Sequence, residues 1–314
     1  MIATNQHISS GNNPKFSVLM SIYHKEIPSN FERAMQSIWN EQSVKPSEIV
    51  LVEDGPLTVE LDNIIDQWKL RLNSIFHVVS LEKNLGTGEA KNFGLEKCSF
   101  EIVAIMDTDD ISLFNRFEKQ LNAFERYNID VCGAWVNEFE VDETKINTIK
   151  RTPEYHQDIV KFSKYRSPTN HVTTMFKKTV VMNSGGYQKM MWLEDYYLFV
   201  RLIQSGAKFY NIQESLVNVR AGVGQLERRR GLKYAFSELR LQRKMLELDF
   251  LNLFEFSINV ILRFAFRMVP NQAFIYLFNN QEILILKKNG YFSVIQFNII
   301  SDNGVDNCVL VKYL

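Results

Sequence analysis

The sequence lacks a net charge, and it has few cysteines. Its 36 Lys and Arg residues balance 36 Asp and Glu residues, so no overall field favours nucleic acid, and we expect no nucleic-acid partner. The three cysteines, Cys98, Cys132 and Cys308, lie far apart and form no CxxC pair. This spacing argues against a zinc ribbon or a disulfide scaffold and is typical of a reducing cytoplasm.

Long apolar runs are also missing. The first fifteen residues, MIATNQHISSGNNPK, are polar and lack the apolar core of a secretory signal. The longest apolar stretch, residues 256–269, is interrupted by Arg263 and Arg267 and followed by Pro270. It is too short and too charged to span a bilayer comfortably. We therefore expect a cytoplasmic protein.

The first half of the chain alternates strand-like apolar runs with helix-like amphipathic segments. Such alternation predicts βαβ units and a mostly parallel sheet. The expected strands cover residues 16–22, 48–55, 75–81, 101–107 and 130–139. The expected helices cover residues 29–42, 57–72, 86–98 and 112–127.

The rhythm changes after residue 140. Residues 142–170 are polar, and a strand at 171–178, a helix at 192–206 and a strand at 207–212 are expected to follow. From about residue 226 the composition becomes helical, while the last 34 residues are strand-like and weakly patterned. We predict a catalytic region over 1–225 and a mainly helical region over 226–314.

Acidic residues follow three of the expected strands. The first strand ends at Ser21–Tyr23, the second at Glu53–Gly55, and the fourth at Asp107, Asp109 and Asp110. Because ligands of open α/β sheets bind beyond the carboxyl ends of strands, these groups should share one edge. Like charges held together repel, and a divalent cation would relieve the repulsion; oxygen ligands suit Mg²⁺ or Mn²⁺. The alternative is purely structural: Asp110 caps the helix at 112–127 and Asp107 merely ends a strand.

Several motifs together give a resemblance to a known family. In order along the chain they are FSVLMSIYHKE (16–26), EIVLVEDGP (48–56), NLGTGEAKNFGL (84–95), AIMDTDD (104–110) and WLEDYYLFVRL (192–202). This set resembles the family 2 glycosyltransferases, which have the α/β GT-A fold, over roughly residues 14–220. Within the family it is most similar to bacterial transferases that add glucose or galactose to O-antigen or exopolysaccharide repeat units.

The resemblance implies a binding site for a UDP-sugar. Ser21, Tyr23 and Glu26 match the nucleotide-contacting segment, although Ser-Ile-Tyr-His replaces the usual Pro-x-Tyr-Asn. Asp54 matches the acid that reads uracil. Lys91 stands where the family usually has Arg, so it supplies positive charge without the bidentate fork.

The same resemblance assigns the remaining acids. Asp107 matches the acid near the ribose, and Asp109 the acid that ligates a metal on the diphosphate; we expect both carboxylates in the Mn²⁺ or Mg²⁺ site. Glu194 and Asp195 match the family's ED motif, whose aspartate is the general base. The alternative is that these two acids open a helix and interact with its dipole.

The expected activity is an inverting, metal-dependent transfer of glucose or galactose from a UDP-hexose. The acceptor is expected to be a sugar linked to undecaprenyl diphosphate. Two other readings stay open: a nucleotidyltransferase, which would favour a glycine-rich loop after the first strand, and a non-catalytic nucleotide-sugar-binding module, favoured by an ED pair buried in the core.

Two basic segments outside the motifs have candidate roles. Arg220, Arg228 and Arg230 lie where a lid would reach the diphosphate, but such arginines are more often solvated. Residues 261–280 mix Arg263 and Arg267 with bulky apolar residues, which suits a helix lying peripherally on the cytoplasmic face of the membrane. The alternative is that this segment packs as ordinary core.

Overall fold

A computed structural model describes residues 14–221, 231–268, 284–288, 291–300 and 305–313, with side chains up to residue 264. Its helices and short 3₁₀ turns cover most of the expected helical segments. They are α1 (Pro28–Trp39), α2 (Val59–Leu72), η1 (Asn73–Ile75), α3 (Thr87–Lys97), α4 (Arg116–Arg126), α5 (His156–Phe162), η2 (His171–Thr173), α6 (Lys178–Asn183), α7 (Glu194–Gln204), α9 (Gly231–Glu247) and α10 (Leu253–Met268).

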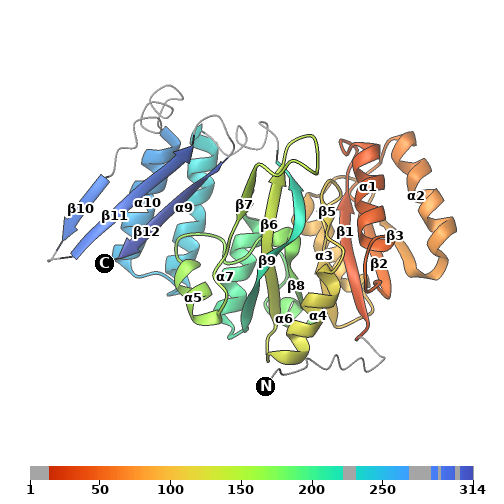
Figure 1. The fold of residues 1–314 in the computed structure, drawn as a ribbon, viewed down its shortest axis with the longest axis horizontal. Helices are drawn as coiled ribbons and strands as arrows, with labels where there is room; N and C mark the ends of the chain where they lie inside the picture. Colours follow the sequence, from red (N-terminus) through yellow and green to blue (C-terminus); the bar gives the residue numbers. More distant parts are fainter. Residues whose placement is uncertain (1–13, 222–230, 269–283, 289–290, 301–304, 314) are drawn as a thin grey trace, which may run out of the picture.

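The strands form one large sheet and one small sheet (Figure 1). The large sheet has the order β3-β2-β1-β4-β8-β6-β9-β5, with β7 paired to β6. Its strands are β1 (Phe16–Ile22), β2 (Glu48–Glu53), β3 (Phe76–Ser80), β4 (Ile102–Ile105), β5 (Ile111–Ser112), β6 (Val131–Phe139), β7 (Thr148–Lys150), β8 (Met175–Lys177) and β9 (Phe209–Arg220). The small sheet is antiparallel and contains β10 (Leu284–Lys288), β11 (Tyr291–Ile300) and β12 (Val305–Tyr313).

The parallel half of the large sheet is covered on both faces. Alternate residues of β1 point to opposite faces. Val18 and Met20 pack with α1, α2 and α4, whereas Leu19 packs with α3, α7 and α9. Strands β1, β2 and β4 are therefore mostly apolar and buried, as expected for parallel strands covered on both sides, whereas the edge strand β3 is partly exposed.

The α/β fold and the order of the expected elements are confirmed. The structure adds β7, α5 and α6, which were not expected, and the other differences lie at element ends. The fourth helix begins at Arg116 rather than near residue 112, because Ile111 and Ser112 pair with β9 as strand β5. Strand β9 runs well past residue 212, because it pairs with β6 as far as Arg220. The expected strand at 171–178 is a 3₁₀ turn followed by the short strand β8.

Helix α3 lies unusually close to the sheet. A Cβ atom added at Gly94 would lie 2.3 Å from Cδ1 of Leu19 and 2.6 Å from Cγ2 of Val52. No side chain fits in that space, so glycine is required for this approach. The close packing brings the first turn of α3 to the carboxyl ends of β1 and β2.

The C-terminal region continues the core of the catalytic region. Tyr234, Leu241 and Met245 of α9 belong to the same buried cluster as Leu19 of β1. The predicted boundary at residue 225 is therefore not a break in the packing. The strand-like character of the last 34 residues corresponds to β10–β12, which follow helices α9 and α10.

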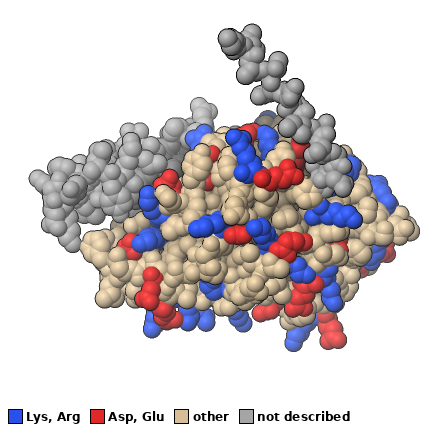
Figure 2. Space-filling view, turned by 90° about the horizontal axis from the view of Figure 1, so that it is seen from below, with Lys and Arg blue, Asp and Glu red and all other residues tan. Residues whose placement is uncertain are grey.

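The surface carries both signs of charge. On the face seen in Figure 2, acidic and basic side chains are interspersed over a broad uncharged surface. In the described part of the chain, none of the helices is long and apolar enough to cross a membrane.

Candidate active site

The carboxyl ends of β1, β2 and β4 meet at one edge of the sheet, as predicted. Ile22 pairs with Glu53, and Leu19 pairs with Ile105. Backbone hydrogen bonds extend this register beyond the strands, from Asp54 N to Ile22 O (2.8 Å) and from Met106 N to Leu19 O (3.0 Å). The polar residues that follow the three strands are therefore held side by side. We call the acids gathered here the carboxylate rim: Glu26, Asp54, Asp107, Asp109 and Asp110.

Two members of the carboxylate rim have specific side-chain partners. Lys91 of α3, only 2% exposed, places its Nζ 3.0 Å from Oδ1 of Asp107. Thr108 donates its hydroxyl to Glu26 at 2.5 Å, and Glu26 also accepts from the Ile27 N–H at 2.8 Å. The loop after β1 and the helix α3 are thus both fastened to the segment that follows β4.

The carboxylate of Asp54 is hydrogen-bonded to the loop before α3. Its two carboxylate oxygens accept the N–H groups of Leu85 (2.6 Å) and Gly86 (3.0 Å). The neighbouring Gly55 has φ +87°, and a Cβ there would lie 2.7 Å from the backbone nitrogen of Asn84. Asp54 and Gly55 therefore fix the position of the loop, and a nucleotide contact by Asp54 would be added to this role.

The three acids after β4 titrate differently because their neighbours differ. Burial alone would raise the pKa of Asp107, but the charge and hydrogen bond of Lys91 and the charge of Arg116 outweigh it and lower that pKa. Burial, followed by the charges of Asp107 and Glu26, raises the pKa of Asp109 to about 6. Burial and the charges of Asp109 and Asp107 also raise the pKa of Asp110 well above its usual value.

A buried arginine lies beneath the carboxylate rim. Arg116 is fully buried and donates to the carbonyls of Ile105 (2.6 Å) and Val172 (2.9 Å). Burial lowers its pKa to about 9, opposed by the negative charges of Asp107 and Asp110, so it remains charged at neutral pH. The sequence reading missed this residue. The available signal was a basic residue on the buried stripe of α4, which also contains Phe117 and Leu121.

The donor atoms of the carboxylate rim fit a hard divalent cation. Asp109 forms no ion pair with any residue whose side chain the structure describes, and like charges oppose its ionisation. No group of three or more acidic, His or Cys side chains in the described ranges is arranged to hold a metal by itself. A cation here would have to take most of its ligands from phosphate and water, which is how Mg²⁺ is commonly bound.

The acidic pair of the expected helix at 192–206 lies at the start of α7. Glu194 and Asp195 are both half-buried rather than in the core. Glu194 packs against the first turn of α3, since a Cβ at Gly88 would lie 3.5 Å from its Cγ. Burial raises the pKa of Glu194, and the charge of Asp195 adds to the effect. Helix α3 thus connects the Asp107 end of the site with the acidic pair.

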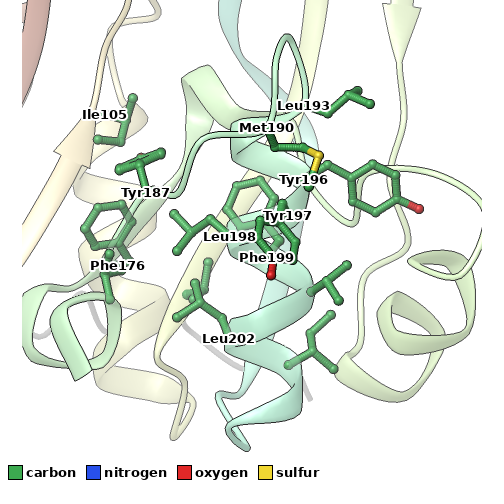
Figure 3. Packing of buried hydrophobic residues seen from close by; sticks show 14 of the residues in the cluster. Ile105, Phe176, Tyr187, Met190, Leu193, Tyr196, Tyr197, Leu198, Phe199 and Leu202 are labelled. Atoms are coloured by element: carbon green, nitrogen blue, oxygen red, sulfur yellow. The ribbon is translucent and has the colours of Figure 1, made fainter. Parts of the chain in front are cut away.

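The loop that leads into α7 is fixed to α3. Asn92 donates to the Tyr187 carbonyl (2.8 Å) and accepts the Tyr187 N–H (2.7 Å). Figure 3 shows Tyr187 on the Ile105 side of the buried cluster, with Met190 and Leu193 nearer to Tyr196. Helix α3 therefore holds both the loop before α7 and the start of α7.

His171 and Tyr187 lie between the two groups of acids, and sequence reasoning gave neither a role. His171 Nε2 is 2.8 Å from the Tyr187 hydroxyl. Burial and the charge of Lys91 lower the pKa of His171 to about 4, although Asp195 and Asp107 act in the opposite direction. The imidazole is therefore neutral near pH 7, and the charges of Asp107 and Asp195 both act on its pKa. No spacing in the sequence signalled this position.

Other predicted residues have varied outcomes. Ser21 is half-buried and Tyr23 is exposed at the same edge as the carboxylate rim. The capping role considered for Asp110 is wrong, because α4 begins after Asn115 and Asp110 instead accepts the Arg220 N–H at 2.8 Å. Arg220 lies beside the rim, with its Nε 3.4 Å from the Asp109 carbonyl. Arg228 and Arg230 lie outside the described residues.

Comparison with known proteins decides the family. The family model "Glycosyl transferase family 2" matches residues 17–190, which include every member of the carboxylate rim. The chain belongs to glycosyltransferase family 2. This result favours the glycosyltransferase reading over a nucleotidyltransferase, and the half-buried acidic pair does not meet the condition set for a non-catalytic module.

Two named bacterial relatives of this chain are glycosyltransferases. An Escherichia coli protein named UDP-Gal:alpha-D-GlcNAc-diphosphoundecaprenol beta-1,3-galactosyltransferase is 39% identical over 262 residues, covering 83% of this chain and 94% of the relative. The amylovoran biosynthesis glycosyltransferase AmsE of Erwinia amylovora is 38% identical, covering 84% and 97%. The match extends over nearly the whole length of both relatives.

Solved structures confirm the GT-A fold of this glycosyltransferase. Staphylococcus aureus TarS aligns with a TM-score of 0.59 at 16% identity, covering 83% of this chain. This chain spans only 45% of that TarS chain. A TarS 1–349 structure in complex with UDP-GlcNAc aligns with a TM-score of 0.56 at 18% identity, covering 74% of this chain and 66% of TarS 1–349. At these identities the likeness concerns the fold alone.

Proposed function

We propose that this glycosyltransferase moves a galactose or glucose from UDP to a sugar hydroxyl of an undecaprenyl-diphosphate-linked intermediate, with inversion at the anomeric carbon. The observation that carries the proposal is the gathering of the carboxylate rim, Lys91 and the acidic pair of α7 around the first turn of α3. The name of the E. coli relative supports galactose as the donor sugar and GlcNAc as the acceptor sugar.

The carboxylate rim is proposed to bind the donor. Ser21, Tyr23 and Asp54 would contact the nucleoside, and Asp107 the ribose. Lys91 already neutralises Asp107, and it adds positive charge close to the leaving group. Glu26, joined to Thr108, holds the loop after β1 against the segment that carries Asp109.

Asp109, with Asp107 beside it, would hold Mn²⁺ or Mg²⁺. When bound, the cation supplies Lewis-acid neutralisation of the charge that develops on the departing UDP. Burial and, after it, the charges of Asp107 and Glu26 raise the pKa of Asp109, and a bound cation would offset those two charges, which supports this role.

Asp195 is proposed as the general base. It opens α7 and is half-buried, so an acceptor hydroxyl can approach it. Asp195 takes the acceptor proton as the acceptor oxygen attacks the anomeric carbon on the face opposite UDP, and no covalent enzyme intermediate is needed. Glu194, held against α3, orients the start of the helix.

The direct test measures transfer and donor hydrolysis separately. The protein is incubated with Mn²⁺ and UDP-galactose, UDP-glucose or their N-acetyl forms, with and without GlcNAc-diphosphate carrying a short alkyl chain. Slow UDP release without the acceptor and faster release with it, for a hexose donor, support the proposal. UDP release from none of the four donors would contradict it.

The proposed location is peripheral, on the cytoplasmic face of the membrane where such an acceptor lies. Apolar side chains of α10 are exposed, among them Phe254 (55%) and Ile261 (66%). Arg263 does not reach outward as expected: it pairs with the buried Glu238 at 2.6 Å. Exposed basic residues come instead from Arg240 and Arg243 of α9, which line a shallow hollow of about 330 Å³.

Membrane docking can be tested with two exposed residues. The double variant F254S/I261S should lose co-sedimentation with anionic liposomes while it keeps activity on the short-chain acceptor. The control L70S changes an 86%-exposed leucine on α2, at the opposite end of the molecule in Figure 1. Equal sedimentation of both variants and the wild type would reject docking by α10. The rest of the predicted segment, residues 265–280, lies beyond the described side chains.

A further inference from the structure

The turn that precedes the acidic pair holds a tryptophan in an unusual conformation. Trp192 has φ +65°, in the left-handed region that bulky residues rarely adopt. Its side chain is nevertheless 43% exposed. Strained backbone that the surrounding structure maintains tends to occur at functional sites. We call residues 190–193 the Trp192 turn.

The Trp192 turn is fixed by contacts with α9 and by a hydrogen bond within the turn. The indole of Trp192 stacks on Tyr234 of α9, with ring centroids 5.6 Å apart and planes at 23°. Ser237, also on α9, donates its hydroxyl to the Met191 carbonyl. Within the turn, Leu193 N donates to Met190 O at 2.7 Å. Helix α9 therefore holds the indole in place while leaving it accessible.

The anchoring extends into the core. Met190 and Leu193 are buried in the same cluster as the α7 residue Leu198 (Figure 3). Trp192 and Asp195 are three residues apart, so their Cα atoms lie within about 11 Å of each other. The turn is thus anchored in the core, and Trp192 lies three residues before the proposed base.

We propose that Trp192 is a platform for the acceptor sugar, stacking its exposed indole surface against the apolar face of a pyranose ring. An immobile aromatic ring offers large contact area at little entropic cost, because few rotatable bonds are frozen when a ligand binds. The inference rests on the proposed function and adds a positioning residue to it: stacking would orient the acceptor so that one hydroxyl faces Asp195.

A purely structural role predicts something different. If Trp192 only packs on Tyr234, its removal would weaken the fold or misplace Glu194 and Asp195. The rate would then fall at every acceptor concentration, so kcat itself would be lower. A platform instead affects acceptor binding and leaves the donor steps unchanged. The distinguishing quantities are the acceptor KM, the donor KM and acceptor-free donor hydrolysis.

The test compares W192L with W192F on GlcNAc-diphosphate carrying a short alkyl chain, with UDP-galactose as donor. W192L keeps an apolar side chain without an aromatic face, and should raise the acceptor KM about tenfold. The donor KM and acceptor-free hydrolysis should stay within about twofold of wild type. W192F keeps a ring and should raise the acceptor KM by about threefold or less.

A matched control changes an exposed aromatic residue of α9, the helix against which the Trp192 turn packs. Phe236 of α9 is 58% exposed and contacts Phe264 of α10 rather than the Trp192 turn. F236L should leave all three quantities at their wild-type values. A rise in acceptor KM for F236L equal to that for W192L would overturn the proposal.

Fluorescence gives a second readout that does not depend on W192L folding. The protein has four tryptophans, and saturating acceptor in the presence of UDP should change the emission of the wild type but not that of W192F. Wild-type transfer with an unchanged acceptor KM in W192L, or an equal emission change in W192F, overturns the platform alone. A wild-type protein that transfers nothing to this acceptor overturns the proposed function, and the platform with it.

Discussion

The carboxylate rim and the Trp192 turn lie on either side of helix α3 and are built in opposite ways. The rim consists of charged groups with specific partners, such as Asp107 with Lys91 and Asp54 with the 85–86 backbone. The Trp192 turn is held by ring stacking and buried apolar anchors, and it leaves a large side chain accessible. The comparison indicates that a charged edge, proposed for the donor, and a fixed aromatic surface, proposed for the acceptor, can share one scaffold.

The strongest test of this division removes the proposed metal ligand. D109A should lower turnover by about 10³-fold or more, because the charge on leaving UDP is no longer neutralised. Calorimetry should show loss of the Mn²⁺-dependent part of UDP affinity, with the fold intact by circular dichroism. The control D66A removes an exposed acid of α2 and should change neither quantity. Unchanged Mn²⁺–UDP binding in D109A would remove Asp109 from the site.

A change at the start of α7 should spare donor binding. D195N keeps the shape of the side chain and removes its basicity, so turnover should fall by about 10²–10⁴-fold. The affinity for UDP-sugar, measured by calorimetry, should stay close to wild type. If E194Q abolished turnover and D195N left it near normal, the roles within the pair would be reversed.

Acid should weaken metal binding at the carboxylate rim. The folded protein disfavours ionised Asp109, whose pKa is about 6. Protons compete with the metal below that pH, so Mn²⁺–UDP affinity should fall by up to about tenfold per pH unit as pH drops from about 6 to 5. E26Q removes one of the charges that raise this pKa and should move the midpoint to lower pH. Equal affinity across this range would show that Asp109 does not bind the metal.

The smallest expected effect is a change in stability rather than in catalysis, and it comes from a substitution in helix α3. G94A should destabilise the protein by about 1–3 kcal/mol, because the added methyl overlaps Leu19 and Val52. Chemical denaturation measures this change. E96A, on the exposed side of α3, should stay within about 0.5 kcal/mol of wild type. If both variants were equally stable, the close approach of α3 would not be required.

Sequence reading predicted the carboxylate rim well, because its members follow recognisable strands. Apolar runs such as residues 16–22 identify buried strands, and the carboxyl ends of parallel strands must share an edge. The edge that the rim occupies follows from these local patterns, whereas Glu26 and the role of Asp54 come from the family resemblance. Motif resemblance then supplied the family, which the family model confirmed.

The Trp192 turn and the residues beneath the rim could not be predicted in this way. The stacking of Trp192 on Tyr234 joins positions 42 residues apart along the chain. The contact of His171 with Tyr187 depends on the path of the loop before α7. Periodicity reports only whether a segment is helical or extended, so contacts that depend on how distant segments pack are not contained in it.

The buried Arg116 has a consequence for the interval between catalytic cycles. When no donor is bound, the acids of the carboxylate rim lie close together at the edge of the sheet. Arg116 cannot depart, because it is tied to the Ile105 and Val172 carbonyls, and its charge acts on Asp107 and Asp110 throughout. The resting enzyme thus contains its own permanent counterion, and its melting temperature in a chelating buffer should match that in Mn²⁺ without nucleotide.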